Sequence, residues 1–138
     1  MKRSSGSTGH ILVVDDSPTN RLLVAKLLAK AGFRVMAAED GGEALALALT
    51  ASPDLILMDI AMPGIDGLKA AALIRRGPED VALTPIIAMS ANTDDGDRAA
   101  CAAAGMNDFL PKPFATEDLL ATVGRWIAGQ PAVAEAAV

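Results

Sequence analysis

Short apolar runs alternate along the chain with longer segments in which apolar residues recur every three or four positions. The short runs are rich in Val, Ile and Leu, which is typical of strands buried on both faces of a parallel sheet. They occupy residues 11–14, 33–38, 55–58, 85–90 and 109–110. The longer segments predict helices at residues 18–31, 42–50, 68–75, 93–104 and 116–127.

This alternation predicts an α/β fold, a doubly wound parallel sheet of five strands with right-handed crossovers and helices on both faces. Asp16-Ser17-Pro18 starts the first helix, with a capping residue followed by proline near the first turn, and Gly32 ends it. Leucines repeat on one face of this helix, at Leu22, Leu23, Leu27 and Leu28. In the second helix, Leu45 and Leu49 lie four residues apart.

The length of 138 residues suits one domain with a substantial core, predicted at residues 10–127. Residues 1–9 are rich in Ser and Gly and are expected to form a flexible leader. Residues 128–138 are rich in Ala and are expected to form a flexible tail. The candidate chemistry therefore has to come from the central segment.

Composition narrows the classes of function. The net charge of −5 argues against direct nucleic-acid binding, because phosphate contacts need clustered Lys and Arg. No uncharged apolar run approaches the roughly 18 residues of a membrane span, so no membrane insertion is expected. The single cysteine, Cys101, cannot form an internal disulfide, which favours a reducing, cytoplasmic location.

Charged residues stand where the predicted strands end. Asp15 and Asp16 follow the first strand, Asp59 follows the third, and Lys112 follows the fifth. The carboxyl ends of parallel strands meet at one edge of a sheet, so these side chains should converge. At an effective dielectric near 20, two carboxylates about 4 Å apart repel by about 4 kcal/mol. Such a cluster needs a cation or a proton, and its hard oxygen ligands favour Mg²⁺ together with phosphate.

Each of these residues alone has a simpler interpretation. Asp is a common cap in solvated strand-to-helix turns, and a single Asp at a strand end is ambiguous. The joint pattern is more informative, because Asp15-Asp16, Asp59, Ser90 and Lys112 all follow or end predicted strands. Together they favour Mg²⁺-assisted phosphoryl chemistry at the carboxyl edge of the sheet.

Four motifs resemble the receiver (response-regulator) domains of bacterial two-component signalling. They lie at residues 11–16 (ILVVDD), 58–67 (MDIAMPGIDG), 85–91 (PIIAMSA) and 112–114 (KPF). The resemblance covers about residues 10–127. The residues of the motifs also resemble those of receivers attached to hybrid sensor kinases. It implies a flavodoxin-like (βα)5 fold with strand order 2-1-3-4-5. It also implies that the Lys112–Pro113 peptide bond is cis.

The resemblance implies that Asp59 is the phosphoacceptor and that Mg²⁺ binds beside it. Asp16 would ligate the metal directly, Asp15 mostly through water, and the backbone carbonyl of Ile60 would complete the protein ligands, together with Asp59. Mn²⁺ or Ca²⁺ would substitute in vitro. Lys112 would pair with a phosphoryl oxygen as a mobile point charge.

The same resemblance implies a switch. Ser90 would hydrogen-bond a second phosphoryl oxygen, and its movement would let the ring of Phe109 turn inward. The face formed by helix 93–104, strand 109–110 and helix 116–127 would then change shape and bind a downstream protein. The phosphodonor would be a histidine kinase or a histidine phosphotransfer protein. The domain would catalyse only its own phosphorylation and dephosphorylation; if it comes from a hybrid sensor, the parent would be a histidine kinase.

Three alternatives compete with this interpretation. An aspartyl-phosphate phosphatase would carry an Asp-x-Asp pair and a cap domain, whereas this chain has adjacent aspartates and no spare length. A flavodoxin-like cofactor binder would need a Ser/Thr/Gly-rich phosphate loop after the first strand, where Asp15-Asp16 would repel phosphate. A degenerate receiver acting only as an interaction module is ranked low, because all the key positions are filled.

Overall fold

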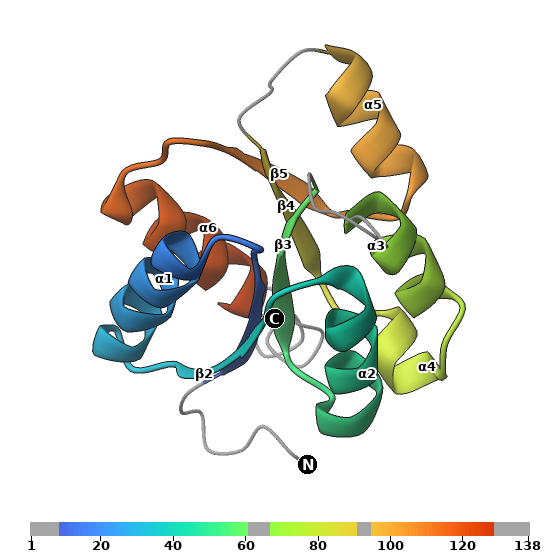
Figure 1. Cartoon of the computed structure of the whole chain (residues 1–138), viewed down its shortest axis with the longest axis horizontal. Helices are drawn as coiled ribbons and strands as arrows, with labels where there is room; N and C mark the ends of the chain where they lie inside the picture. The colour runs from blue at the N-terminus through green and yellow to red at the C-terminus, as the bar shows by residue number, and fades with distance from the viewer. Residues whose placement is uncertain (1–8, 61–66, 91–94, 129–138) are drawn as a thin grey trace, which may run out of the picture.

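The computed structural model describes residues 9–60, 67–90 and 95–128 (Figure 1). The predicted leader and tail lie almost wholly outside these residues, as does the start of the helix predicted from residue 93. Five parallel strands form one sheet in the order β2-β1-β3-β4-β5. The strands are β1 (His10–Val14), β2 (Arg34–Ala38), β3 (Leu55–Asp59), β4 (Ile86–Ser90) and β5 (Asp108–Pro111). The doubly wound fold and its strand order are thus confirmed.

Helices cover both faces of this sheet, with α1 and α6 on one side and α2, α3 and α5 on the other (Figure 1). They are α1 (Pro18–Lys30), α2 (Gly41–Ala51), α3 (Gly67–Arg75), α4 (Glu79–Ala82), α5 (Asp95–Ala103) and α6 (Thr116–Ala128). The short α4 is not predicted from the sequence, because four residues are too few for a periodic pattern. No helix among the described residues is both long and apolar enough to cross a membrane.

The core is divided into two layers by the alternation of side chains along each strand. Ile11 and Val13 of β1 pack with α1 and α6, whereas Leu12 and Val14 pack with α2 and α3. All four are fully buried, as are the corresponding residues of the central strand β3. This two-sided burial explains why the strands appear in the sequence as nearly continuous apolar runs.

The buried face of α1 differs from the predicted one. Leu22 and Leu23 are more than half exposed, whereas Val24 and Leu28 are buried against the sheet. The prediction of a common leucine face was wrong because leucines five and six positions apart spread around a helix of 3.6 residues per turn. The orientation of α1 is set by the residues that fit the sheet, and Leu22 and Leu23 remain at the surface.

The buried face of α2 is also shifted, by one residue, toward its alanines. Ala44 and Ala48 are fully buried, whereas Leu49 is 44% exposed and Leu45 is only partly buried. These alanines belong to the same core layer as Ala70 and Ala71 of α3. Small side chains at this position allow α2 to lie close to its neighbours, so the leucine pair is displaced to the margin of the core.

Candidate functional site

Three carboxylates meet at the carboxyl edge of the sheet. Asp15 and Asp16 follow β1, and Asp59 is the last residue of the neighbouring strand β3. One carboxylate oxygen of each residue lies within 4.8 Å of those of the other two. Asp15 and Asp59 are almost fully buried, whereas Asp16 is exposed. The structure therefore brings together the acidic residues that the strand-end placement predicts to converge.

Lys112 reaches the same site from the end of β5. Its Nζ lies 3.3 Å from Asp15 Oδ2 and 3.3 Å from Asp59 Oδ2. Its backbone N–H donates to the carbonyl of Ser90 at 2.7 Å, which ties its position to β4. The Lys112–Pro113 peptide bond is cis, as the receiver resemblance implies. The receiver resemblance pairs this ammonium group with a phosphoryl oxygen; in the structure it also links two carboxylates.

Every polar atom of Asp15 takes part in a hydrogen bond. Its Oδ1 accepts from the backbone N–H of Ser17 at 2.9 Å, and its own N–H donates to the Ala38 carbonyl at 3.1 Å. Arg21 Nη1 donates to the Asp15 carbonyl at 2.8 Å. This role of Arg21 is not predicted from the sequence, because no local pattern links a helical arginine to a carbonyl six residues earlier. These bonds fix the turn that carries both adjacent aspartates.

The site fits a divalent cation. Three carboxylates and one ammonium group leave a formal charge of −2 when all are ionised. The Asp16 carboxylate is exposed and makes no hydrogen bond to another described residue, so it remains available as a ligand. Carboxylate oxygens are ligands that suit Mg²⁺, which binds through one or two carboxylates and keeps several waters.

Ser90 and Phe109 lie on the neighbouring strands β4 and β5. Ser90 ends β4 and is 4% exposed. Ala88 pairs with Phe109 and Ser90 with Pro111, so Ser90 and Phe109 point to the same face of the sheet by the two-residue alternation. The Phe109 ring is half-buried, and the Arg98 guanidinium of α5 lies 4.5 Å from its centroid. This cation–π contact is not predicted from the sequence.

A polar clamp fixes β5 next to Phe109. Asp108 Oδ2 accepts from Trp126 Nε1 at 2.7 Å and from Arg125 Nη2 at 2.9 Å, both on α6. Its Oδ1 accepts from the Phe109 N–H at 2.8 Å. Burial opposes ionisation of Asp108, but these hydrogen bonds outweigh it and lower the pKa of its carboxyl. The clamp therefore anchors the strand that carries Phe109 to α6.

Gly67 begins α3 directly against the site. A Cβ at this position would overlap the carbonyl oxygen of Asp59 and would lie 2.7 Å from Ile60 Cα. Gly67→Ala is therefore expected to lower the free energy of unfolding by about 1–3 kcal/mol, because backbone atoms must move. Urea denaturation measures this loss.

Gly124→Ala is the matched control for that substitution. A Cβ at Gly124, inside α6, would meet nothing within 4 Å. The control is expected to stabilise the protein by about 0.5–1 kcal/mol through helix propensity. If both variants are equally stable, α3 does not pack against Asp59 as closely as described.

The fold and this site define a class of signalling domain, and comparison with known proteins identifies it. The sequence model of the response regulator receiver domain matches residues 11–124, and the chain belongs to that family. Its function is that of a phosphoacceptor receiver in two-component signalling. The fold expected from the receiver resemblance is confirmed by solved structures of the same family.

Relatives of two kinds are similar to this chain. Protein PilH of Pseudomonas aeruginosa is 39% identical over 120 residues, which are 87% of this chain and 98% of PilH. The autoinducer sensor kinase/phosphatase CqsS of Vibrio cholerae is 39% identical over 118 residues, but these are 86% of this chain and only 17% of CqsS. The chain therefore spans nearly all of the first relative and a small part of the second.

Solved receivers superpose closely on the structure. The receiver domain of a Pseudomonas aeruginosa sensor histidine kinase is 40% identical with a TM-score of 0.83, over 89% of this chain and 100% of that domain. That domain was crystallised with a magnesium ion coordinated in its active-site cleft. Vibrio cholerae CheY4 is 35% identical with a TM-score of 0.82, over 86% of this chain and 98% of CheY4.

Proposed function

We propose that Asp59 is the phosphoacceptor and that the phosphodonor is the phosphohistidine of a histidine kinase or of a histidine phosphotransfer protein. The observation that supports this most directly is the contact of Lys112 Nζ with the nearly buried carboxylates of Asp15 and Asp59. A cation held at the acceptor carboxylate is well placed to receive phosphoryl oxygens. The exposed Asp16 at the same edge completes an anionic site that a divalent cation can enter.

Mg²⁺ would be held by the carboxylates of Asp16, Asp15 and Asp59 and by the backbone carbonyl of Ile60. When bound, the metal would supply positive charge to the phosphoryl oxygens and reduce their repulsion by the carboxylates. Mn²⁺ or Ca²⁺ would bind to the same ligands in place of Mg²⁺, since all three cations accept oxygen donors. The residues of the chain supply the nucleophile and its orientation.

The transfer is a displacement at phosphorus. A carboxylate oxygen of Asp59 forms the new O–P bond while the P–N bond to the donor imidazole breaks, and the electron pair stays on that ring nitrogen. Lys112 Nζ moves from the carboxylate to a phosphoryl oxygen, where its charge stabilises the transition state. The Ser90 hydroxyl donates to another phosphoryl oxygen. Positioning and charge therefore account for the catalysis.

Phosphorylation then shifts a conformational equilibrium. The added group, which carries about −1.5 to −2 charge by analogy with phosphorylated hydroxyl residues, draws Ser90 toward it. Phe109 lies on the same face of the sheet and follows into the space that Ser90 leaves. This movement changes the face formed by α5, β5 and α6, which we propose as the binding surface for a downstream protein.

Acetyl phosphate tests this function directly. With Mg²⁺ and no kinase, the wild-type chain should gain one phosphoryl group by intact-mass measurement, because the nucleophile, the lysine and the metal ligands all belong to this chain. Alkaline hydroxylamine should remove the group, as expected for an acyl phosphate. If the chain stays unmodified while a receiver control is labelled, it acts as a phosphorylation-independent interaction module.

Mg²⁺ is expected to stabilise the fold. At a concentration 100 times its Kd, a ligand that binds only the folded state adds about 2.7 kcal/mol to the free energy of unfolding. Asp16→Ala should lose most of this gain, because it removes the most accessible ligand of the cluster.

Glu79→Ala is the matched control, since it removes one exposed acidic group on α4. Thermal melts of the three proteins with and without Mg²⁺ measure the difference. An equal gain in Asp16→Ala and wild type would place the metal elsewhere.

A further inference from the structure

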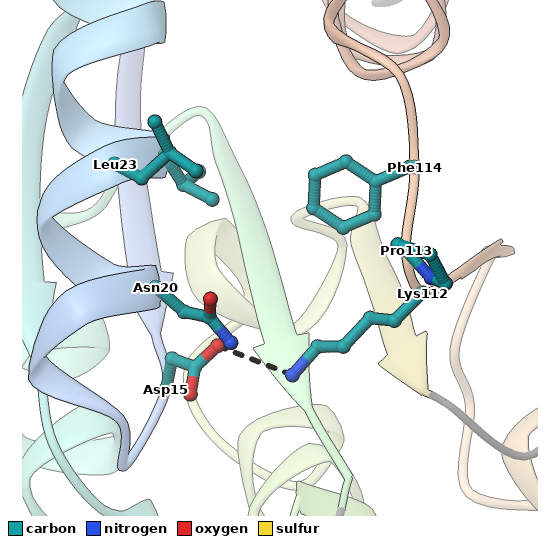
Figure 2. A pocket seen from close by; sticks show the side chains of 7 residues that line it. Asp15, Asn20, Leu23, Lys112, Pro113 and Phe114 are labelled. Atoms are coloured by element: carbon teal, nitrogen blue, oxygen red, sulfur yellow. Dashed lines mark hydrogen bonds and ion pairs between the residues drawn. The ribbon is translucent and has the colours of Figure 1, made fainter.

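A cavity of about 320 Å³ opens beside the acceptor site, between α1 and the segment that follows β5 (Figure 2). Its lining residues are Asp15, Asn20, Leu23, Val24, Lys112, Pro113 and Phe114. Asp15 and Lys112 also belong to the acidic site, so the cavity is continuous with the place where phosphoryl transfer is proposed. It is large enough for a small ring and the carbons that carry it.

One hydrogen-bonding side chain of the lining, Asn20, has no partner among the residues that the structure describes. The walls are apolar, with Leu23 and Val24 on the α1 side and Phe114 on the other. The Asn20 carboxamide points from α1 toward Asp15 and the end of the Lys112 side chain in Figure 2. The Asn20 backbone N–H binds the Ser17 hydroxyl, whereas its carboxamide makes no hydrogen bond to another described residue. This pattern suits a flat, mostly apolar group with one polar atom.

We propose that this cavity receives the leaving imidazole of the phosphodonor and that Asn20 is a positioning residue for that ring. The proposal rests on the proposed function, because it concerns the donor imidazole that is released when Asp59 takes the phosphoryl group. In an in-line displacement the leaving group departs on the side of phosphorus opposite the attacking oxygen. Asp59 is nearly buried, so the departing ring moves outward, and the cavity offers space that borders Lys112 and Asp15.

The Asn20 carboxamide favours the protonated form of the donor imidazole, which is the form that leaves most readily. In the protonated donor, one ring nitrogen carries the phosphoryl group and the other carries a proton. Asn20 Oδ1 accepts a hydrogen bond from that N–H, which stabilises the protonated ring. When the P–N bond breaks, its electron pair remains on the first nitrogen and neutral imidazole is released with its proton on the second. No further proton or co-reactant is needed.

The same contact predicts a preference among donors. Acetyl phosphate releases a carboxylate, which has no N–H to donate to Asn20. Phosphoimidazole releases the same ring as phosphohistidine and should use the contact. Asn20→Leu keeps the branching of the side chain at Cγ, removes the hydrogen bond and improves helix propensity, so the variant should fold. Its phosphorylation by phosphoimidazole should be about tenfold slower, the effect of losing one hydrogen bond to a charged donor.

The experiment compares initial rates of Asp59 phosphorylation by phosphoimidazole and by acetyl phosphate, at saturating Mg²⁺ and over a range of pH. Asn20→Leu should lower the ratio of the two rates about tenfold, and most strongly at pH values where the donor ring is protonated. Asn20→Gln, which keeps the amide, should restore part of the ratio. Thr19→Val removes a polar group from an exposed neighbour that does not line the cavity and should leave the ratio unchanged.

The outcomes separate this inference from the function on which it rests. An unchanged ratio in Asn20→Leu, with both donors still labelling Asp59, would overturn the role of Asn20 and leave the receiver function intact. Equal slowing with both donors would also overturn it, since that result indicates a general effect on the site. Failure of the wild-type chain to react with either donor would overturn both proposals.

Discussion

Asp59→Asn is expected to abolish phosphorylation by acetyl phosphate, the largest effect expected of any single substitution here. The amide that replaces the carboxylate is a poor nucleophile, while its shape is nearly unchanged. The variant should therefore fold normally and remain unlabelled by intact-mass measurement in the presence of Mg²⁺. Asp54→Asn is a useful comparison, because Asp54 lies just before β3 and accepts from the His10 N–H at 2.8 Å, outside the acidic site.

Two further variants separate the roles around Asp59. Asp16→Ala should slow labelling by weakening metal binding, so raising the Mg²⁺ concentration should restore much of the rate. Lys112→Ala should slow labelling at any Mg²⁺ concentration, because the group that contacts both Asp15 and Asp59 is lost. Labelling that survives Asp59→Asn would place the phosphoacceptor elsewhere in the chain.

Arg75→Met is expected to lower the free energy of unfolding by about 3 kcal/mol or more, a larger loss than Gly67→Ala should cause. Arg75 ends α3, and its guanidinium donates to backbone carbonyls of Ala82 and Thr84 at 2.8 Å each. It also donates to the Gly105 carbonyl at 2.8 Å and to Asn107 Oδ1 at 2.6 Å. One side chain thus joins α3 to the ends of α4 and α5.

Burial of this guanidinium lowers its pKa, yet an arginine stays charged in any ordinary buffer. Methionine would fill much of the space and leave the three backbone carbonyls without the Arg75 donor, at about 1–3 kcal/mol for each one that water cannot reach. Asn107 Oδ1 would still accept from the Ile86 N–H. Arg75→Lys should recover only part of the lost stability, because an ammonium group cannot reproduce the planar, forked set of donors of the guanidinium.

The neighbouring Arg76 provides the control, since it is exposed and makes no side-chain bond to another described residue. Arg76→Met should change the free energy of unfolding by less than about 0.5 kcal/mol. Urea denaturation of both variants measures the contrast. Equal losses would mean that the hydrogen bonds of Arg75 contribute little to folding.

Much of the fold follows from local sequence patterns. The strands were predicted within one or two residues because burial on both faces demands apolar runs that are visible without any tertiary information. The start of the first helix was predicted at Asp16-Ser17-Pro18, and in the structure Ser17 Oγ accepts from the Asn20 N–H at 3.3 Å. The strand order was predicted from the receiver resemblance, since hydrophobic patterns do not specify which strands are neighbours.

The meeting of the three carboxylates could likewise be predicted from the sequence. Asp15, Asp16 and Asp59 stand at strand ends, and the geometry of a parallel sheet places such ends along one edge. The same argument brought Lys112 to the site. It did not predict that Lys112 would contact two carboxylates, because that depends on side-chain reach across three strands.

By itself, then, the sequence determined the alternation of strands and long helices, without the short α4, together with the parallel sheet and the residues of the acidic site. Strand periodicity and strand ends are local properties of the chain. Only the tertiary structure decided which face of α1 is buried, since that rotation depends on how Val24 and Leu28 fit the sheet. The contacts of Arg75 and the exposure of the Asn20 carboxamide to the cavity were decided in the same way. They join residues from separate elements, and such contacts exist only once the helices have packed.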